Sequence, residues 1–252
     1  MPLATTIRDL HRRKGRERRG LALAEGVRLV EEMLVAGVRC KGAVVSPALR
    51  ATPRGAALVA ALSQAGVVVE DVSDQELASF AATEHPQGVV AVYQPRQWEL
   101  SELRPAARRP VVLLDAVQDP GNVGTIARTA LAFGASGMIA LPGTADLANP
   151  KVVRAAAGAL FRLPHLHADQ VAVLAWVRRE GVALWATAME GEPMPATPDT
   201  PVALVLGNEG AGMQPELLAA ATRRVTIPIR AASESLNVAV AAGILLHHLG
   251  SA

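Results

Sequence analysis

Three turns in the second half of the sequence carry residue types that could bind a ligand or take part in catalysis. The first turn follows a continuous apolar run and contains Gly121, Asn122 and Gly124. Glycine lets the backbone approach a partner closely, and asparagine can cap the helix that follows. Arg128 then falls less than two helical turns beyond Asn122. Taken alone, the same pattern also fits an ordinary capped turn without a ligand.

The second turn is unusually rich in glycine. Gly207, Gly210 and Gly212 fall within six residues, and Glu209 stands among them. A simple chain reversal needs fewer glycines, and the Glu209 carboxylate could meet a cationic group. A glycine-rich hairpin is the alternative interpretation.

The third turn leads into a strongly apolar helix. Pro228 fixes the chain after a strand, and Ser235 is a suitable helix cap. Capping explains Asn237 less well, because an amide at the head of so apolar a helix is better used if it faces a site. We therefore expect the Asn237 side chain to face a ligand.

The elements around these turns alternate between strands and helices. Apolar runs predict strands, and helical spacing of apolar residues predicts helices between them. The predicted strands are 111–114, 137–141, 160–163, 182–186, 202–206 and 225–229, and the predicted helices are 123–133, 150–157, 170–180, 215–221 and 236–249. This alternation indicates a doubly wound parallel sheet, in which ligands bind beyond the carboxyl ends of the strands. The Gly-x-Gly-x-x-Gly fingerprint is absent, which disfavours the rival function of a nucleotide-dependent oxidoreductase.

Composition shifts divide the chain. Residues 1–95 show short alternating strands and helices, including a Ser73-x-x-Glu76 capping pattern, and predict a small α/β domain. Residues 95–110 contain three prolines, mixed charge and no sustained period, which indicates a linker at 96–110. Residues 111–252 form the predicted sheet domain. The fold class is therefore α/β with two domains.

Composition also excludes several classes of protein. Half of the residues are apolar and the formal net charge is +2, so intrinsic disorder is excluded. The one cysteine, Cys40, rules out an intrachain disulfide or a multi-cysteine metal site and fits a reducing compartment. The longest apolar stretch, Val238–Leu246, is about half of what a membrane crossing needs. We expect a cytoplasmic protein with neither a membrane partner nor a metal.

The charge is unevenly distributed. Residues 1–20 contain seven Lys and Arg against only Asp9 and Glu17. A basic arm of this kind indicates a polyanionic partner such as a nucleic acid, and a solvated charged helix end is the alternative.

In this order and spacing, the three turns resemble the three motifs of the SpoU/TrmH family of RNA ribose 2′-O-methyltransferases. Asn122, Gly124 and Arg128 match the first motif. Residues 207–212 match its Gly-x-Glu-Gly-x-Gly motif, and residues 227–228 and 235–238 match Ile-Pro followed by Ser-Leu-Asn-Val. The resemblance covers 111–249. Asn208 departs from it, because many members have a small residue there; we expect this to be tolerated, since the turn acts mainly through its backbone.

The resemblance implies a fold and partners that the periodicity of the sequence could not show. It implies a deep trefoil knot in the C-terminal domain, a homodimer, and a ribosomal-protein-like RNA-binding domain at the N-terminus. Family members with such a domain usually act on large-subunit (23S) ribosomal RNA, whereas members without it often act on transfer RNA. Ribosomal RNA is thus the expected substrate, transfer RNA is the alternative, and a non-catalytic RNA-binding protein is the rival from another class.

The resemblance also implies the site residues. The cofactor would be S-adenosylmethionine, bound by Thr187, Leu206, Gly207, Asn208, Gly212, Ile227 and Leu236. Catalysis would involve Asn122, Arg128, Glu209, Ser235 and Asn237. The RNA phosphates would meet Arg12, Arg13, Lys14, Arg16, Arg18 and Arg19.

The chemistry of the guanidinium group argues against one role that the resemblance implies for Arg128. Proposals for the family make this arginine the base that removes the proton of the ribose hydroxyl. A guanidinium has no acceptor atom and a pKa of about 12 or more. We therefore expect Arg128 to stay charged and to bind the adjacent phosphate or the developing oxyanion, while Glu209, Ser235 and Asn237 orient Arg128 or the ribose.

Overall fold

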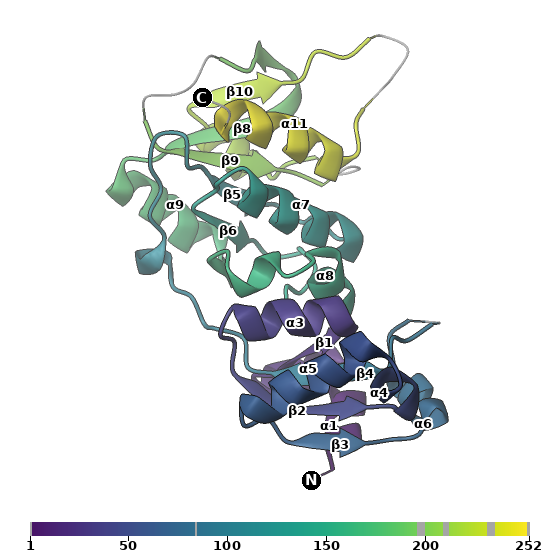
Figure 1. Ribbon diagram of the computed structural model, residues 1–252. Coiled ribbons are helices and arrows are strands. Elements are labelled where there is room, and N and C mark those ends of the chain that lie inside the picture. The colour runs from purple at the N-terminus through teal and green to yellow at the C-terminus, as the bar shows by residue number, and fades with distance from the viewer. Residues whose placement is uncertain (1, 84, 196–199, 209–211, 231–234, 251–252) are drawn as a thin grey trace. The chain divides into compact units, whose positions relative to one another are not determined.

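The computed structural model describes residues 2–83, 85–195, 200–208, 212–230 and 235–250. Its contacts divide the chain into two compact units (Figure 1). One unit comprises Met1–Arg96 together with Ala148–Phe161, and the other comprises Gln97–Leu147 with Arg162–Ala252. The division differs from the predicted ranges in two places: 148–161 groups with the first unit, and the predicted linker 96–110 is divided, with Arg96 in the first unit and 97–110 in the second.

The first unit is built on a four-stranded mixed sheet. Its strand order is β1-β4-β2-β3, with β4 antiparallel to both of its neighbours and β2 parallel to β3. The elements are α1 (Leu3–Leu10), α2 (Arg13–Arg19), β1 (Ala22–Glu25), α3 (Val27–Val35), β2 (Cys40–Val45), α4 (Pro47–Arg50), α5 (Pro53–Gln64), β3 (Val69–Asp71), α6 (Asp74–Phe80), β4 (Val89–Tyr93), α8 (Pro150–Ala155) and the 3₁₀ helix η2 (Ala159–Phe161). The predicted Ser73 cap is confirmed, because its side chain accepts the Glu76 N–H at 3.1 Å.

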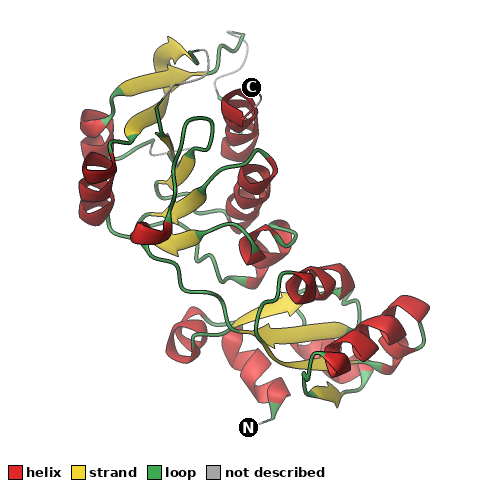
Figure 2. Cartoon of the chain, turned by 60° about the vertical axis from the view of Figure 1, so that its left-hand side comes forward, coloured by secondary structure: helices red, strands yellow, loops and turns green. Residues whose placement is uncertain are grey.

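The second unit is a six-stranded parallel sheet. Its strand order is β10-β8-β9-β5-β6-β7, and every neighbouring pair is parallel. The elements are η1 (Leu100–Glu102), β5 (Val111–Leu114), α7 (Pro120–Ala132), β6 (Gly137–Ala140), β7 (His165–His167), α9 (Gln170–Glu180), β8 (Ala183–Pro193), β9 (Val202–Leu206), α10 (Pro215–Ala220), β10 (Arg223–Thr226) and α11 (Val238–Gly250). Helices lie on both sides of this sheet (Figure 2). The predicted parallel sheet is confirmed.

Three predicted strands differ from the structure, and one of them, predicted at 225–229, is observed as β10 at Arg223–Thr226. The apolar run 160–163 is not a strand; it contains the end of η2, and the edge strand β7 begins at His165. Apolar content alone does not distinguish a short strand from a helical turn. In addition, β8 continues well past the predicted 182–186 and ends at Pro193, in a stretch that is mostly exposed and therefore lacks an apolar signal.

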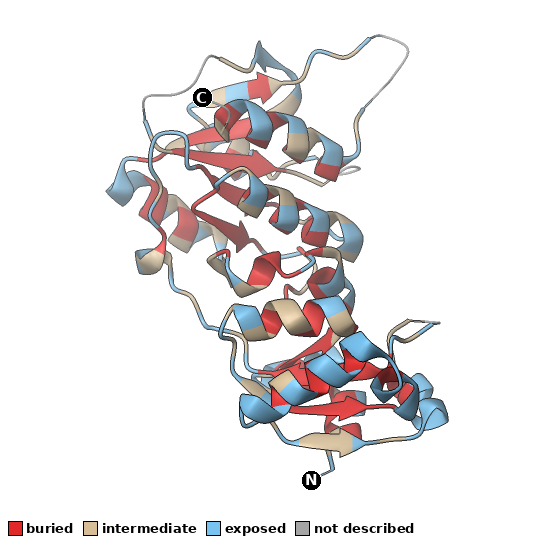
Figure 3. Cartoon of the chain, in the orientation of Figure 1, coloured by how far each residue is buried: buried red, intermediate tan, exposed pale blue. Residues whose placement is uncertain are grey.

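The central strands of the second unit are buried on both faces (Figure 3). Every residue of β5, β6 and β9 is buried, which explains why these strands read as continuous apolar runs rather than alternating ones. None of the helices within the described ranges is both long and apolar enough to cross a bilayer.

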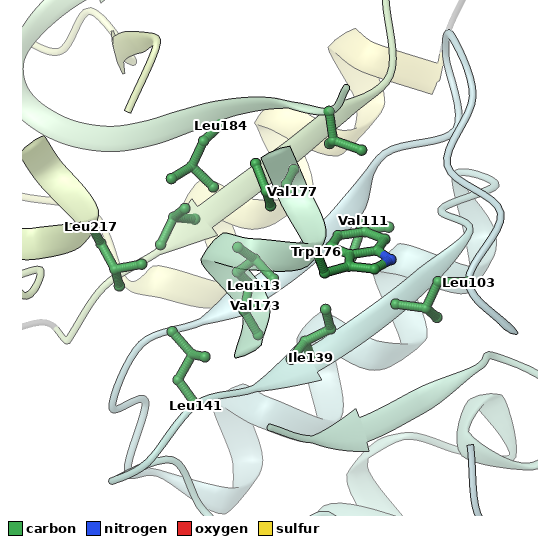
Figure 4. Close-up of a cluster of buried hydrophobic side chains, with 13 residues drawn as sticks. Leu103, Val111, Leu113, Ile139, Leu141, Val173, Trp176, Val177, Leu184 and Leu217 are labelled. Atoms are coloured by element: carbon green, nitrogen blue, oxygen red, sulfur yellow. The ribbon is translucent and has the colours of Figure 1, made fainter. Parts of the chain in front are cut away.

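Trp176 anchors one face of this sheet. It extends from α9 toward Val111 of β5 and Ile139 of β6, in a cluster that also includes Leu103 (Figure 4). The indole is 1% exposed, and its Nε1 has no hydrogen-bond partner among the described residues. Its contribution therefore comes from packing rather than from a polar contact.

We predict that Trp176→Ala lowers the free energy of unfolding by about 3–5 kcal/mol, because it leaves a large cavity in this cluster. Trp176→Phe should lower the free energy of unfolding by less. It leaves a smaller cavity, and it removes a buried N–H that has no hydrogen-bond partner among the described residues. Denaturant unfolding checks both variants. Val171→Ala, at a position 79% exposed on the same helix, is the control and should change stability by less than about 0.5 kcal/mol. Equal losses for Trp176→Ala and Val171→Ala would contradict the assignment.

Candidate active site

The first two turns begin side by side at the carboxyl end of the sheet. β5 pairs with β9 in a register that sets Leu114 opposite Leu206, the last residues of their strands. The ladder continues one step further, where the Asp115 N–H donates to the Leu206 carbonyl at 2.9 Å. This edge is where ligands bind in parallel sheets.

The second turn is a tight loop held by its own backbone. Asn208 and Gly212 exchange two backbone hydrogen bonds of 3.1 and 3.0 Å. A Cβ at Gly207 would lie 3.1 Å from the backbone carbon and oxygen of Gly212, so only glycine fits there without a shift. Gly212 has a φ of 72°, in the left-handed region that favours glycine. Glu209 and Gly210 lie outside the described residues.

The side chain of Asn208 also takes part in this loop. Its Nδ2 donates to the Ala116 carbonyl at 2.8 Å, which ties the second turn to the first. The expectation that this turn acts mainly through its backbone is therefore wrong at Asn208.

The first turn differs from the prediction in how its helix begins. α7 begins at Pro120, and Asp119 is its cap, with a side chain that accepts the Asn122 N–H at 2.8 Å. The predicted capping role of Asn122 is wrong, because the helix starts before it. The Asn122 side chain is instead directed to the third turn, where its Oδ1 accepts a hydrogen bond from Asn237 Nδ2 at 3.1 Å.

Asn237 has two functions at once. Its Oδ1 accepts the backbone N–H groups of Ala239 at 3.0 Å and Val240 at 3.3 Å, so it caps α11. The view that capping explains Asn237 poorly is therefore wrong. Because the oxygen is used for the cap, the amide nitrogen is oriented toward Asn122, and the first and third turns are joined.

The second and third turns line one cavity of about 520 Å³. Its lining includes all seven residues predicted to bind the cofactor: Thr187, Leu206, Gly207, Asn208, Gly212, Ile227 and Leu236. Ser235, predicted as catalytic, also lines it. The residues that the sequence did not reveal are Ala188, Met189, Met213, Leu218, Val225, Thr226, Ile229, Val238, Ala241 and Leu245. Most of these are apolar, and nothing in the sequence distinguishes them from core residues.

The described lining of this cavity contains no charged side chain. Thr187 donates its hydroxyl to the Val205 carbonyl at 2.9 Å, which fixes its orientation at the wall. A cavity of this volume, mostly apolar and with a few polar groups, is typical of small-molecule sites. It suits a ligand held by apolar contact and by main-chain groups.

Arg128 is not part of the cavity lining. It is exposed on α7, six residues beyond Asn122, and the described part of the structure gives it neither a hydrogen bond nor an ion pair. Its guanidinium is therefore accessible to a ligand outside the cavity.

The basic arm is partly neutralised by its own residues. Asp9 accepts hydrogen bonds from Arg19 at 2.5 Å and Arg18 at 2.7 Å, and Arg13 pairs with Glu17 at 2.7 Å. The hydrogen bond from Arg19, followed by that from Arg18, lowers the pKa of Asp9 below its ordinary value despite an opposing contribution from desolvation.

Arg16 does not fit its predicted contact with RNA. It is 5% exposed, and its Nη1 donates to the carbonyls of Leu10 at 2.9 Å and His11 at 3.0 Å. These carbonyls lie at the end of α1, so Arg16 holds α1 to α2. Arg12 and Lys14 are exposed.

The histidines of β7 have structural surroundings. Nδ1 of His165 donates to the Leu163 carbonyl at 2.8 Å, and burial lowers the pKa of His165. The neutral ring is thus favoured. Across the described ranges, no group of three or more His, Cys, Asp or Glu side chains could hold a metal ion.

Comparison with known proteins identifies the class to which this fold and cavity belong. Residues 109–247 match the SpoU rRNA Methylase family, and residues 4–91 match the MRM3-like substrate binding domain. The 23S rRNA (guanosine(2553)-2′-O)-methyltransferase RlmP of Bacillus subtilis is 35% identical over 244 residues, which cover 96% of this chain and 93% of that protein.

Solved structures agree with this result over nearly the whole chain. The AdoMet-bound rRNA methyltransferase from Sinorhizobium meliloti has a TM-score of 0.87 and 33% identity, covering 98% of this chain and 94% of that one. The SpoU methyltransferase AviRb from Streptomyces viridochromogenes, in complex with AdoMet, has a TM-score of 0.86 and 28% identity, covering 100% and 97%. The chain belongs to the SpoU methylase family and is a methyltransferase whose cofactor is S-adenosylmethionine.

The cavity fits this cofactor. Its volume and its mixture of apolar side chains with main-chain groups suit a nucleoside joined to an amino-acid chain. Its described walls place no positive side chain against the cationic sulfonium.

We predict that Gly207→Ala raises the Kd for S-adenosylmethionine at least tenfold. The added Cβ would meet the backbone of Gly212 and Met213 at 3.1–3.3 Å, and the loop that lines the cavity would have to shift. Isothermal titration calorimetry measures the change. Gly243→Ala is the control, since its Cβ would meet only Thr129 at 3.8 Å, and the affinity should be unchanged. An unaltered Kd for Gly207→Ala would contradict the role of this close approach.

Proposed function

We propose that this protein transfers the methyl group of S-adenosylmethionine to a ribose 2′-hydroxyl of large-subunit ribosomal RNA. The observation that carries the proposal is the convergence of the three turns: two line one cavity, and the Asn237–Asn122 hydrogen bond joins them to the first. The names of several relatives, among them RlmP and the RlmB of Coxiella burnetii, support 23S ribosomal RNA as the substrate. The match of residues 4–91 to a substrate-binding domain supports the same substrate. A ribosomal RNA substrate supports the predicted cytoplasmic location.

The cofactor supplies an electrophilic methyl group on its sulfonium. The residues of the protein must hold this group in line with the acceptor hydroxyl, and orientation of this kind can lower the barrier by several kcal/mol. Thr187, Gly207 and Leu236, which come from three different segments of the lining, would hold the cofactor. Glycine at 207 keeps the loop compact enough to form one of these walls.

Asn122 and Asn237 are proposed to orient the acceptor ribose. Their side chains are bonded to each other, and Ser235 lies two residues away at the wall of the cavity. A paired amide keeps a fixed direction, so the pair would set the direction from which a ribose hydroxyl is bound. Glu209 belongs to the second turn and lies outside the described residues; it is proposed to orient Arg128 or the ribose as well.

Arg128 is proposed to bind the phosphate beside the target nucleotide or the developing oxyanion. Its exposure on α7, beyond Asn122, leaves the guanidinium accessible to a substrate outside the cofactor cavity. A planar guanidinium can donate two parallel hydrogen bonds to a phosphate, which a lysine cannot do.

We predict that Arg128→Ala lowers kcat at least 100-fold and that Arg128→Lys retains only a small part of the activity. The Kd for S-adenosylmethionine should be unchanged in both variants, because Arg128 does not line the cavity. Single-turnover methyl transfer and calorimetry give the two quantities. Nearly full activity in Arg128→Lys would show that the planar, two-donor geometry of the guanidinium is not needed. Arg178→Lys, an exposed arginine on α9, serves as the control.

We propose that the basic arm contacts RNA phosphates chiefly through Arg12 and Lys14. Both are exposed, whereas Arg13, Arg18 and Arg19 are already paired with carboxylates and would have to exchange partners. Phosphate contacts of this kind position the RNA without reading its sequence.

The combined change Arg12→Gln and Lys14→Gln should weaken RNA binding and flatten its salt dependence. Each lost phosphate contact lowers the log–log slope by roughly 0.7–0.9. Binding measured between 50 and 300 mM salt gives the slope. Arg50→Gln is a control of the same charge class, since Arg50 is paired with Asp71 at 2.6 Å in another part of the unit. An unchanged slope in the double variant would exclude the arm.

We also propose a homodimer and a trefoil knot. Val240 and Ile244 of α11 are 52% and 45% exposed and four residues apart, and so they form an apolar stripe that supports a second copy as partner. Light scattering should give twice the monomer mass, and a monomer would contradict the dimer. The chain also returns from the edge strand β10 to place α11 against α7, which follows the inner strand β5, and this path supports the knot.

The activity is tested by incubating the protein with tritiated S-adenosylmethionine and either large-subunit ribosomal RNA or transfer RNA. We expect label in the ribosomal RNA, at a ribose 2′-O position found by mapping. Label only in transfer RNA would move the proposal to that substrate. Binding of both ligands without transfer in any fraction would indicate a non-catalytic RNA-binding protein.

A further inference from the structure

The carboxylate of Asp115 is used in none of the steps above, although it lies at the carboxyl end of β5, where the first turn begins. Asp115 directly follows β5 and is 1% exposed. Both of its oxygens are taken by one residue: the Gln214 backbone N–H donates to Oδ2 at 2.7 Å, and Gln214 Nε2 donates to Oδ1 at 2.6 Å. A buried carboxylate is costly unless it is fully hydrogen-bonded, and here both partners are neutral.

Gln214 lies at the far end of the cavity loop. It is the residue before α10, and its side chain makes no cap to that helix because it is directed to Asp115. The loop between β9 and α10 supplies Gly207, Asn208, Gly212 and Met213 to the cavity lining.

The other end of the same loop, at Asn208, is held by Ala116, the residue that follows Asp115. Asn208 Nδ2 bonds the Ala116 carbonyl at 2.8 Å, and Ala116 adopts a φ of 54°, which is unusual for a residue other than glycine. Residues 115 and 116 therefore hold both ends of the loop, at 208 and at 214. Without the bonds to Gln214, the loop would keep the Asn208–Ala116 bond and the Asn208–Gly212 backbone bonds, but its Gln214 end would lose its attachment to the end of β5.

We propose that Asp115 is a positioning residue for cofactor binding, which holds Gly212 and Met213 in place at the cavity wall through its paired hydrogen bonds to Gln214. The inference rests on the proposed function, because it assigns S-adenosylmethionine to this cavity. Asp115 acts through the loop and does not itself line the cavity. A carboxylate is required because two N–H donors converge on it, and an asparagine would turn its own donor toward one of them.

The test uses the full chain and exchanges the hydrogen-bond acceptor at Asp115 with the side-chain donor at Gln214. Asp115→Asn should raise the Kd for S-adenosylmethionine at least tenfold and raise KM for the cofactor more than it lowers kcat. Gln214→Glu alone should also weaken binding, since two carboxylates would then face each other. The double variant Asp115→Asn/Gln214→Glu restores one donor and one acceptor on each side, and its Kd should return to within about threefold of the original protein.

A matched control separates this role from a loss of stability. Ser136 is buried at the opposite end of β5, where its hydroxyl bonds the carbonyls of Arg109 at 3.1 Å and Pro110 at 3.3 Å. Ser136→Ala should lower the thermal midpoint and leave the Kd for S-adenosylmethionine unchanged. If Asp115→Asn does not fold, Gln214→Met replaces it, because it removes the side-chain donor and keeps the backbone one; its Kd should rise severalfold.

The outcomes distinguish the two proposals. An original protein that binds no S-adenosylmethionine in calorimetry would overturn the proposed function and this inference with it. The inference alone would be overturned if the original protein binds the cofactor and a folded Asp115→Asn or Gln214→Met variant binds it with the same Kd. Failure of the double variant to recover affinity would likewise overturn the hydrogen-bond pairing as the cause.

Discussion

The pairing of β5 with β9 is the constraint on which the site depends. Residues about 90 positions apart in the chain are set opposite each other by this register, so that Asp115 and Gly207 leave the sheet at the same place. A shift of one residue would turn every side chain of the strand to the other face, and both faces are filled by apolar contacts. The packing of the core therefore determines where the functional loops begin.

The site separates two physical tasks. The cavity is neutral in its described lining, which suits a ligand recognised by shape and main-chain groups. The cationic groups lie elsewhere, on α7 and on the basic arm, where phosphates can meet them. This separation keeps positive charge away from a ligand that is itself cationic at its reacting centre. Asp9 and Glu17 pair with Arg13, Arg18 and Arg19, so the proposed contact with RNA is left chiefly to Arg12 and Lys14.

Much of the fold follows from the sequence because the signals are strong there. Two strands, 111–114 and 202–206, match the structure residue for residue, because buried parallel strands read as unbroken apolar runs. The helix 170–180 also matches residue for residue. The convergence of the three turns was also predictable, given strand ends at one edge. The cavity walls formed by Met213, Leu218 and Leu245 were not, because an apolar residue beside a ligand and one in the core look alike in a sequence.

The roles of the polar residues were harder to predict than their positions. Asn122 and Asp119 are both good caps, and only the true start of α7 decides between them. Arg16 looks like its neighbours in the sequence, yet its guanidinium closes the end of α1. The bond between Asp115 and Gln214 spans 99 residues, a separation over which no local pattern operates.

The walls of the cavity are drawn from Thr187 through Leu245, across β8, β9, β10 and α11. During translation, the complete cavity thus cannot exist until Leu245 has left the ribosome. S-adenosylmethionine can therefore stabilise only a chain in which this cavity has formed. Shorter nascent chains gain no stability from the cofactor and depend on the packing of the earlier strands.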